Sequence, residues 1–411
     1  MGAYIIKYVV ILMDGAADYR IAALDNKTPL QYADTPVIGY LARHGKVGMV
    51  KTIPDGIAPG SDVANLSVMG YDPKRYYTGR SSLEAVSMGI NLSESDVTFR
   101  CNLVTLSGED AYTDKVMIDY SAGEISTEEA KILINDIKKE LQTKEINFFP
   151  GVSYRHVIVW ENGPYEFILT PPHDILDKKI TKYLPEGPYK DTILDMMIKS
   201  SRLLKNHPVN KKRMQRGLNP ANSIWIWGEG KKPRLDLFYK KYKLNGSIIS
   251  AVDLIKGIGI CAGLKSVDVK NATGNINTNF KGKANAAVRE LKNGQDFVYI
   301  HIEAPDECSH QGSIEKKVRS IEIIDEKMIG TVKEALDKQG EDYRMLILPD
   351  HRTPIKLRTH TSEPVPFLIY NSTNVTDDPS SSYDEIFAEK TGLYFDEGYK
   401  LIDYFISKKK H

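Results

Sequence analysis

A chain of 411 residues is too long for one compact core, so the sequence predicts a large domain with a smaller companion, or two or three domains. Apolar residues make up 41% and charged residues 27%, a balance that excludes wholesale disorder and a fibrous protein. The 55 basic side chains nearly cancel the 54 acidic ones, and the net charge of +1 disfavours a nucleic-acid or membrane-surface partner.

The first predicted element is a strand at residues 4–13. This run is apolar and rich in β-branched residues, which is typical of a strand buried on both faces of a parallel sheet. It is too short for a membrane span and lacks a small-residue cleavage site, so we do not interpret it as an anchor or a targeting signal. The strand ends at Asp14-Gly15, which places a carboxylate at its carboxyl end.

The three cysteines are widely spaced and odd in number: Cys101, Cys261 and Cys308. This usage argues against a secreted disulfide framework and indicates a reducing compartment. The sequence therefore predicts a cytoplasmic protein.

Ser61 is the candidate nucleophile. Pro59-Gly60 breaks the chain, and the residues from Asp62 onward follow a helical pattern, which places the Ser61 hydroxyl at a helix N-terminus. Backbone N–H groups and the helix dipole would stabilise an alkoxide and an incoming phosphate there, and a metal ion would lower the pKa of the hydroxyl further. The alternative is that Ser61 serves only as an N-cap.

The middle of the chain has a different pattern. Three elements are predicted, namely a helix at residues 126–143 and strands at 154–160 and 165–170 on either side of an Asn-Gly turn. This mixture indicates an α+β arrangement, and an apolar strand at 223–227 marks the return to a buried sheet. We infer an inserted domain at 100–180 that interrupts a main domain made of residues 1–99 and 181–411.

The parallel-sheet pattern returns in the last third of the chain. Apolar strands are predicted at 297–302 and 345–348, with a helix at 313–339 between them. Strand, helix and strand form a βαβ unit, and ligands of such sheets bind outside the carboxyl ends of the strands. The predicted fold class is therefore α/β, a doubly wound, mainly parallel sheet with an inserted smaller α+β domain.

Six side chains with metal-binding groups follow the ends of these strands: Asp14, Asp306, His310, Asp350, His351 and His360. Carboxylate and imidazole ligands suit Mn²⁺ or Zn²⁺ and tolerate Mg²⁺. Because six groups are too many for one ion that must also hold a substrate, two ions are the natural number.

The spacing of these groups leaves alternatives open. Asp306 and His310 are four residues apart, so both face one side of a helix that begins at Pro305, but Asp306 could also be a helix cap and His310 a surface residue. Asp350 and His351 converge only if the strand bends after them. What favours a common site is that all six groups are predicted at one edge of one sheet.

The chain resembles the archaeal-type, cofactor-independent phosphoglycerate mutases of the alkaline phosphatase superfamily. Motifs that carry the resemblance keep the family's order over most of the chain, at residues 10–15, 59–65, 77–85, 99–104, 225–230, 272–274, 282–284, 303–307, 348–351 and 364–367. The resemblance implies a phosphatase-like domain with an inserted domain that closes over substrate. It also implies interconversion of 3-phosphoglycerate and 2-phosphoglycerate through a phosphoserine.

The resemblance also implies roles for individual residues. Ser61 takes the nucleophile position, and the ligands fall into two sets: Asp14, Ser61, Asp350 and His351 for one ion, and Asp306, His310 and His360 for the other. The implied cofactors are two divalent ions, Mn²⁺ foremost with Mg²⁺, Zn²⁺ or Co²⁺ as alternatives, and no 2,3-bisphosphoglycerate. The partner is a small phosphoglycerate substrate, and the sequence does not fix an oligomeric state.

Three basic residues are expected to bind the substrate's anionic groups: Arg155, Arg213 and Lys283. Each could equally be a solvated charge. The chain departs from the family pattern at Arg352, where proline is common, and at Cys308-Ser309, where Ala-Gly is common.

Two other functions remain open. A metal-dependent phosphatase or another phosphomutase of the same superfamily would use the same ligands and nucleophile. A non-catalytic metal-binding protein is disfavoured, because structural sites are usually closed and rich in thiols, whereas these ligands are carboxylates, imidazoles and one hydroxyl.

Overall fold

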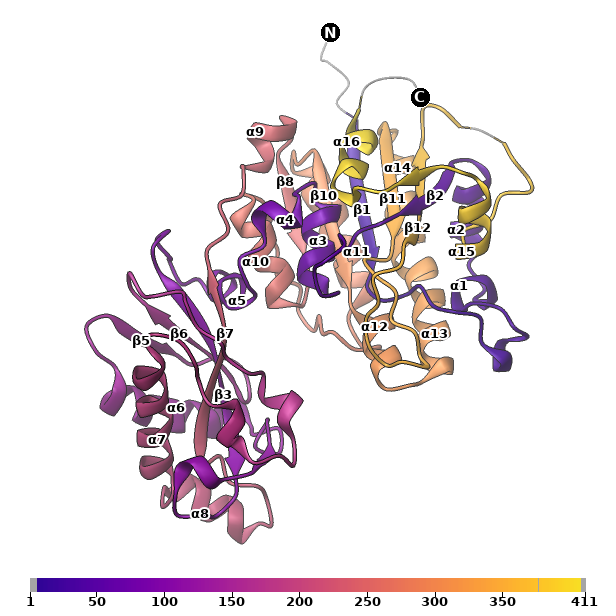
Figure 1. Cartoon of the computed structure of the whole chain (residues 1–411). Coiled ribbons are helices and arrows are strands. Elements are labelled where there is room, and N and C mark those ends of the chain that lie inside the picture. The colour runs from indigo at the N-terminus through magenta and orange to yellow at the C-terminus, as the bar shows by residue number, and fades with distance from the viewer. Residues whose placement is uncertain (1–5, 376, 408–411) are drawn as a thin grey trace. The chain divides into compact units, whose positions relative to one another are not determined.

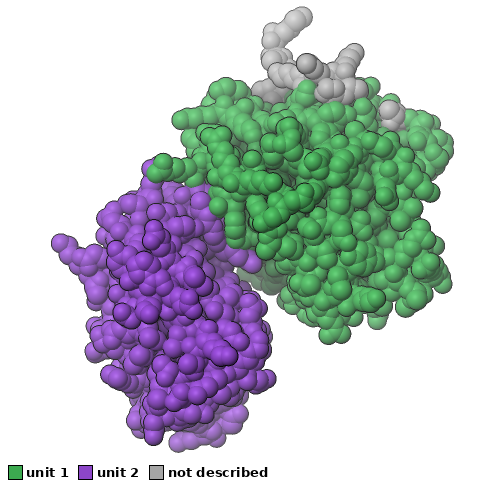
Figure 2. Space-filling view, viewed as in Figure 1, with its two compact units in different colours: residues 1–77, 234–411 green, residues 78–233 purple. Residues whose placement is uncertain are grey.

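The computed structural model describes residues 6–375 and 377–407, which form two compact units. Unit 1 consists of Met1–Tyr77 and Arg234–His411, and unit 2 is the intervening segment Thr78–Pro233. Figure 2 colours the two units separately. Among the described residues, none of the helices combines the length and apolar character that a membrane crossing requires.

The sheet of unit 1 has eight strands, in the order β13 (Tyr394–Phe395), β2 (Lys46–Val50), β12 (Val365–Asn371), β11 (Tyr343–Leu348), β1 (Lys7–Met13), β10 (Phe297–Ile302), β8 (Gly246–Ile249) and β9 (Lys265–Ser266). Strand β12 is antiparallel to both neighbours, and the other described pairings are parallel. This confirms the predicted mainly parallel sheet. Residues 4 and 5 of the first predicted strand lie outside the described residues.

The helices of unit 1 are α1 (Pro29–Tyr32), α2 (Pro36–Arg43), α3 (Ser61–Val68), α4 (Pro73–Tyr76), α9 (Phe238–Tyr242), α10 (Asp253–Cys261), α11 (Phe280–Lys292), α12 (Ala304–His310), α13 (Ile314–Ile324), α14 (Thr331–Gln339), α15 (Glu385–Lys390) and α16 (Leu401–Ile406), with 3₁₀ turns at Ala22–Leu24 and Gly398–Lys400. The helix predicted at 313–339 is one helical run, in which a π-helical segment, Asp325–Gly330, joins α13 to α14. The Asp325 carboxylate accepts hydrogen bonds from the backbone N–H groups of Val37 and Ile38, so this segment caps α2.

Helices cover both faces of the sheet, as Figure 1 shows. On one face, Val9 and Ile11 of β1 join a core cluster with apolar residues of α2, α11, α13 and α14. On the other face, the ring of Tyr8 packs 5.6 Å from that of Phe405 in α16. Successive strand residues point to opposite faces, and the doubly wound arrangement is therefore confirmed.

Unit 2 is built on an antiparallel sheet. Its strands are β4 (Met117–Asp119), β3 (Val97–Leu106), β6 (Arg155–Trp160) and β5 (Ile146–Phe149) in that order, with β7 (Ser223–Lys231) also paired to β3. Its helices are α5 (Ser81–Ser87), α6 (Thr127–Leu141), α7 (Lys190–Leu204) and α8 (Pro208–Gln215), with 3₁₀ turns at Tyr112–Asp114, Pro172–Ile175 and Ile180–Tyr183. The composition is α+β, as predicted, and α6 begins after Ser126, whose hydroxyl accepts from the N–H of Glu129.

The boundaries of this unit differ from the expected 100 and 180. Strand β3 pairs with β7 over nearly its whole length, so residues well beyond 180 complete the same sheet. Helix α7 also packs against β7. The unit accordingly extends from Thr78 to Pro233.

The strand predicted at 165–170 is wrong. Only Ile168 in this segment forms a β-bridge, an isolated one with Glu186. Strand β6 already pairs with β3 on one edge and β5 on the other, so no edge is left for a hairpin partner after the Asn-Gly turn.

Candidate metal centre

Three carboxylates gather beyond the carboxyl ends of the adjacent strands β1, β10 and β11. The backbone N–H of Asp14 donates to Ile302 O at 2.9 Å, and that of Gly15 donates to Asp350 Oδ1 at 3.1 Å. The chain turns at Gly15 with φ +60°, and a Cβ there would lie 2.5 Å from Asp306 Oδ1. Glycine is thus needed both for the turn and for the close approach of these carboxylates.

The first predicted ligand set lies together. His351 Nε2 is 3.5 Å from Asp14 Oδ1 and 3.5 Å from Asp350 Oδ2. Ser61 Oγ is 3.2 Å from the same nitrogen. A hydroxyl, an imidazole and two carboxylates from three separate parts of the chain therefore surround one point.

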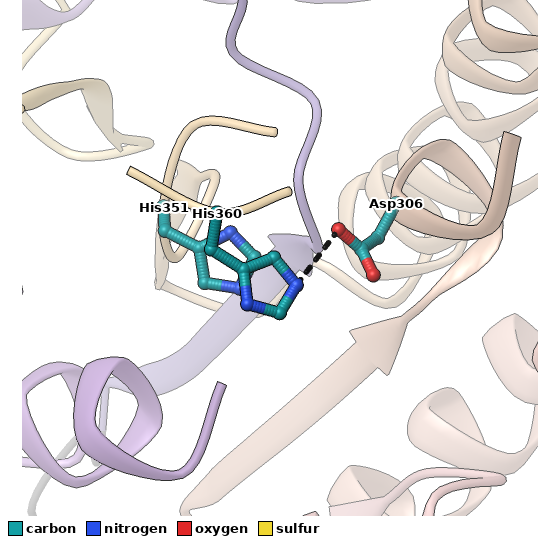
Figure 3. A group of neighbouring side chains, drawn as sticks. All are labelled: Asp306, His351 and His360. Atoms are coloured by element: carbon teal, nitrogen blue, oxygen red, sulfur yellow. Dashed lines mark ion pairs between the residues drawn. The ribbon is translucent and has the colours of Figure 1, made fainter. Parts of the chain in front are cut away.

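The second predicted set is also assembled. Helix α12 places Asp306 and His310 one turn apart, as the spacing predicted, with Asp306 Oδ2 3.1 Å from His310 Nε2. His360 Nε2 is 3.0 Å from His310 Nε2 and 3.5 Å from Asp306 Oδ1. Figure 3 shows His351, His360 and the Asp306 carboxylate converging, and the two imidazole centroids are 4.1 Å apart, so the two sets adjoin.

The buried carboxylates of the cluster repel one another and favour a cation between them. Burial raises the pKa of Asp14 well above its usual range, and the negative charges of Asp350, Asp306 and Glu303 raise it further. Within the described structure, Asp14 Oδ1 is buried and has no hydrogen-bond partner. Burial also lowers the pKa of His351, which keeps its ring neutral. An unpaired buried oxygen beside a neutral imidazole fits a divalent cation.

Ser61 is the first residue of α3, and the helix is capped by the preceding Gly60 without a side-chain hydrogen bond. The alternative role as N-cap is therefore wrong, and the hydroxyl is directed to His351 instead. One turn later, Asn65 Nδ2 donates to Ser61 O at 2.8 Å and to Asp350 Oδ2 at 3.0 Å. Asn65 is a site residue that was not predicted, although its four-residue spacing from Ser61 is a usable signal in the sequence.

His301 was also missed. It lies in β10, with Nε2 2.8 Å from Asp14 Oδ2 and Nδ1 3.1 Å from Ser250 Oγ. Burial lowers its pKa to about 3, so the ring is neutral and orients Asp14. The signal was a single histidine within an otherwise apolar strand.

Lys283 lies in the same unit, on α11. Its side chain is buried, and Nζ donates to His301 O at 3.1 Å. Burial lowers the pKa of Lys283 to about 8. The Lys283 ammonium is therefore close to the carboxylate cluster, because the ring of His301 contacts Asp14.

Comparisons with known proteins show the family of the chain. Residues 42–210 match the family described as 2,3-bisphosphoglycerate-independent phosphoglycerate mutase. The chain is 47% identical over 404 residues to a protein of that name from Methanosarcina barkeri, covering 98% of this chain and 100% of the relative. It is 46% identical over 402 residues to a probable mutase of this kind from Geobacter sulfurreducens, covering 98% and 100%.

The chain belongs to the 2,3-bisphosphoglycerate-independent phosphoglycerate mutase family. Solved structures agree with this family at the level of the fold. A protein from Pyrococcus horikoshii, 29% identical, matches with a TM-score of 0.82 over 100% of both chains. A cofactor-independent phosphoglycerate mutase from Thermoplasma acidophilum, 25% identical, matches with a TM-score of 0.66 over 97% of this chain and 98% of the other.

The two departures from the family pattern leave the ligand set unchanged. The Arg352 guanidinium bonds the backbone, with Nε donating to Pro364 O at 3.0 Å. Cys308 is buried, and burial raises the pKa of its thiol to about 11, so the sulfur stays protonated. Neither residue supplies a further metal ligand.

Among the basic residues expected to bind substrate, Arg213 needs correction. Its side chain is 2% exposed, ion-paired with Glu129, and it donates to the backbone oxygens of Ala122 and Asn219. Every face of this guanidinium is used inside unit 2. Arg213 therefore holds the fold of the unit, and its burial keeps the guanidinium from reaching a substrate.

Arg155 is exposed at the start of β6, and it belongs to a group of three arginines in unit 2. Burial lowers the pKa of Arg100 in β3, and the positive charges of Arg80 and Arg155 lower it further. Arg100 also stacks 4.3 Å from the Trp227 ring. No local pattern in the sequence links these three arginines, because only the packing of β3 against α5 and β6 brings them together.

Proposed function

We propose that this chain interconverts 3-phosphoglycerate and 2-phosphoglycerate through a phosphoserine at Ser61, without 2,3-bisphosphoglycerate. The observation that carries the proposal is the 3.2 Å approach of Ser61 Oγ to His351 Nε2, at the centre of two adjoining ligand sets. Family membership supports the same activity. The substrate is a small phosphorylated acid, and no nucleic acid or membrane takes part.

The proposed ligand roles divide the clustered side chains into two sets. Asp14, Ser61, Asp350 and His351 would hold one divalent ion, and Asp306, His310 and His360 the other. Mn²⁺ suits these oxygen and imidazole donors best, with Mg²⁺, Zn²⁺ and Co²⁺ as alternatives. With two cations bound, the charge of the phosphate oxygens would be neutralised and the pKa of the serine hydroxyl lowered.

The reaction then consists of two displacements. Ser61 Oγ loses its proton and attacks phosphorus, the bond to the oxygen on carbon 3 of the substrate breaks, and that oxygen takes up a proton. Glycerate turns, and its 2-hydroxyl loses its proton and attacks phosphorus. The bond between phosphorus and Ser61 Oγ breaks, and Ser61 Oγ takes up a proton. The α3 N-terminus contributes backbone N–H groups and a favourable dipole to the phosphate.

The substrate's carboxylate needs positively charged groups that are not already neutralised. In unit 2 the positive charges of Arg80 and Arg155 act on Arg100, which pairs with Glu84 at 3.1 Å. This excess of positive charge supports a role in binding the carboxylate, for which guanidinium geometry is suited. Unit 2 would then be the closing domain that excludes water from the phosphoserine.

Lys283 remains a candidate for contact with the phosphate or carboxylate, supported by the hydrogen bond from its Nζ to the backbone of His301, whose ring contacts Asp14. Cytoplasmic location also remains a proposal, supported by three free cysteines.

A direct test uses the purified full chain with Mn²⁺ and 3-phosphoglycerate, coupled to enolase. We expect 2-phosphoglycerate to form at the same rate with and without added 2,3-bisphosphoglycerate, and little free phosphate. Release of phosphate in proportion to substrate consumed would instead identify a phosphatase.

A further inference from the structure

Thr353 lies between the two ligand sets. Its side chain is fully buried, and Oγ1 is 2.6 Å from Asp306 Oδ1 and 3.1 Å from His351 Nδ1. Asp306 is a predicted ligand of one ion, and His351 is a predicted ligand of the other. One hydroxyl therefore contacts both sets, and no motif in the sequence analysis pointed to it.

The chemistry of these three groups fixes where the protons lie. An ionised carboxylate only accepts hydrogen bonds, so the Thr353 hydroxyl donates its proton to Asp306. The same hydroxyl can then only accept from His351, which requires the proton of the neutral ring to be on Nδ1. The lone pair of His351 Nε2 consequently faces the space shared with Asp14, Asp350 and Ser61, where a cation would accept it.

Thr353 is itself held by groups outside both ligand sets. Its backbone O accepts from Lys317 Nζ at 3.0 Å, and its N–H donates to Ala17 O at 3.2 Å. Lys317, on α13, is fully buried and paired with Asp18 at 2.8 Å. A buried ion pair that includes a residue of α13 therefore helps to set the position of the Thr353 hydroxyl. Gly15 is also needed beside this hydroxyl, because a Cβ at position 15 would lie 2.6 Å from Thr353 Oγ1.

We propose that Thr353 is a positioning residue that orients one ligand of each metal set at once, so that loss of its hydroxyl weakens binding of both ions. The inference rests on the proposed two-metal function. Loss of a side chain that hydrogen-bonds a metal ligand commonly lowers metal affinity by about 10- to 100-fold.

The test compares Thr353→Val and Thr353→Ser with the wild type by titration with Mn²⁺, measured by calorimetry and by the electron paramagnetic resonance signal of free Mn²⁺. We expect valine to weaken both binding steps by about 10- to 100-fold, and serine, which keeps the hydroxyl, to bind nearly as the wild type does. Thr105→Val is the matched control, because it removes a buried hydroxyl bonded to Pro220 O in unit 2.

Several outcomes would overturn the proposal. Wild-type affinity for two ions in Thr353→Val would reject the role of Thr353 while leaving the proposed function intact. Weakening of one ion alone would reject the link between the sets, and absence of Mn²⁺ binding in the wild type would reject both proposals. If valine prevents folding, judged by circular dichroism, Thr353→Ala is titrated in the same way.

A second readout needs no metal. Long-range ¹H–¹⁵N correlation spectra of histidine-labelled protein report the ring tautomers of its nine histidines. We expect His351, assigned by its loss in His351→Gln, to be protonated at Nδ1 in the wild type and to lose this preference in Thr353→Val. A ring protonated at Nε2 in the wild type would overturn the proposal.

Discussion

Ser61 Oγ lies 3.2 Å from His351 Nε2, although 290 residues separate them in the sequence. The helix that begins at Ser61 and the strand that ends before Asp350 bring the hydroxyl to the predicted ligands. Asn65 links both elements by bonding Ser61 O and Asp350 Oδ2. The position of Ser61 is therefore set by the fold before any substrate binds.

Replacing Ser61 by alanine should abolish mutase activity. We expect kcat to fall by at least about 1,000-fold, because the phosphoryl group loses its covalent acceptor. The enolase-coupled assay measures the change. Ser67→Ala is the control, since its hydroxyl lies on the same helix but bonds Thr52 O; it should stay active. Normal turnover in Ser61→Ala would show that the nucleophile lies elsewhere.

Removing divalent ions should abolish activity reversibly and lower stability. Asp14 Oδ1 is buried and lacks a hydrogen-bond partner in the described structure, which favours a cation beside it. An ion present at about 100 times its Kd adds about 2.7 kcal/mol per site to the free energy of unfolding. The thermal midpoint with EDTA, and after Mn²⁺ is restored, measures this. EDTA already saturated with Mn²⁺ is the control, and full activity of metal-free protein would refute the two-ion mechanism.

Arg213 and Arg155 should respond differently to substitution. Arg213→Ala leaves Glu129 and two backbone oxygens without their buried donor. We therefore expect the free energy of unfolding to fall by about 3 kcal/mol. Arg155→Ala should raise KM and leave stability unchanged, because this side chain is exposed. Urea unfolding and steady-state kinetics distinguish the two effects. A raised KM with unchanged stability in Arg213→Ala would show that Arg213 binds the substrate after all.

Unit 2 should lose stability in acid because of His156. This side chain is buried in β6, its Nδ1 accepts from Gly151 N–H, and burial lowers its pKa to about 3. Below the unfolded pKa of about 6.5, only the unfolded chain binds the proton, so stability falls as the pH falls. Between pH 7.5 and pH 5 the loss from this group is about 2 kcal/mol.

His156→Gln, which does not titrate in this range, should reduce that pH dependence. Urea unfolding of both proteins at the two pH values, followed by the fluorescence of the tryptophans in unit 2, measures the difference. Equal acid sensitivity in the two proteins would show that another group is responsible.

The sequence alone determined the architecture of the main domain and most of the candidate site. Buried β-branched runs, a helical repeat between two of them, and carboxylates at their carboxyl ends are local patterns, and the pairing of Asp306 with His310 follows from helical spacing. These features depend on residues only a few positions apart. Such patterns can be recognised without coordinates.

Only the tertiary structure decided the rest. Parallel register places His301 opposite Leu12, within reach of Asp14, and Thr353 meets Asp306 after a turn that no periodicity predicts. The pairing of β3 with β7 set the extent of unit 2, and burial among backbone oxygens removed Arg213 from the substrate site. Register and burial depend on contacts between residues far apart in the sequence, and local composition carries no record of these contacts.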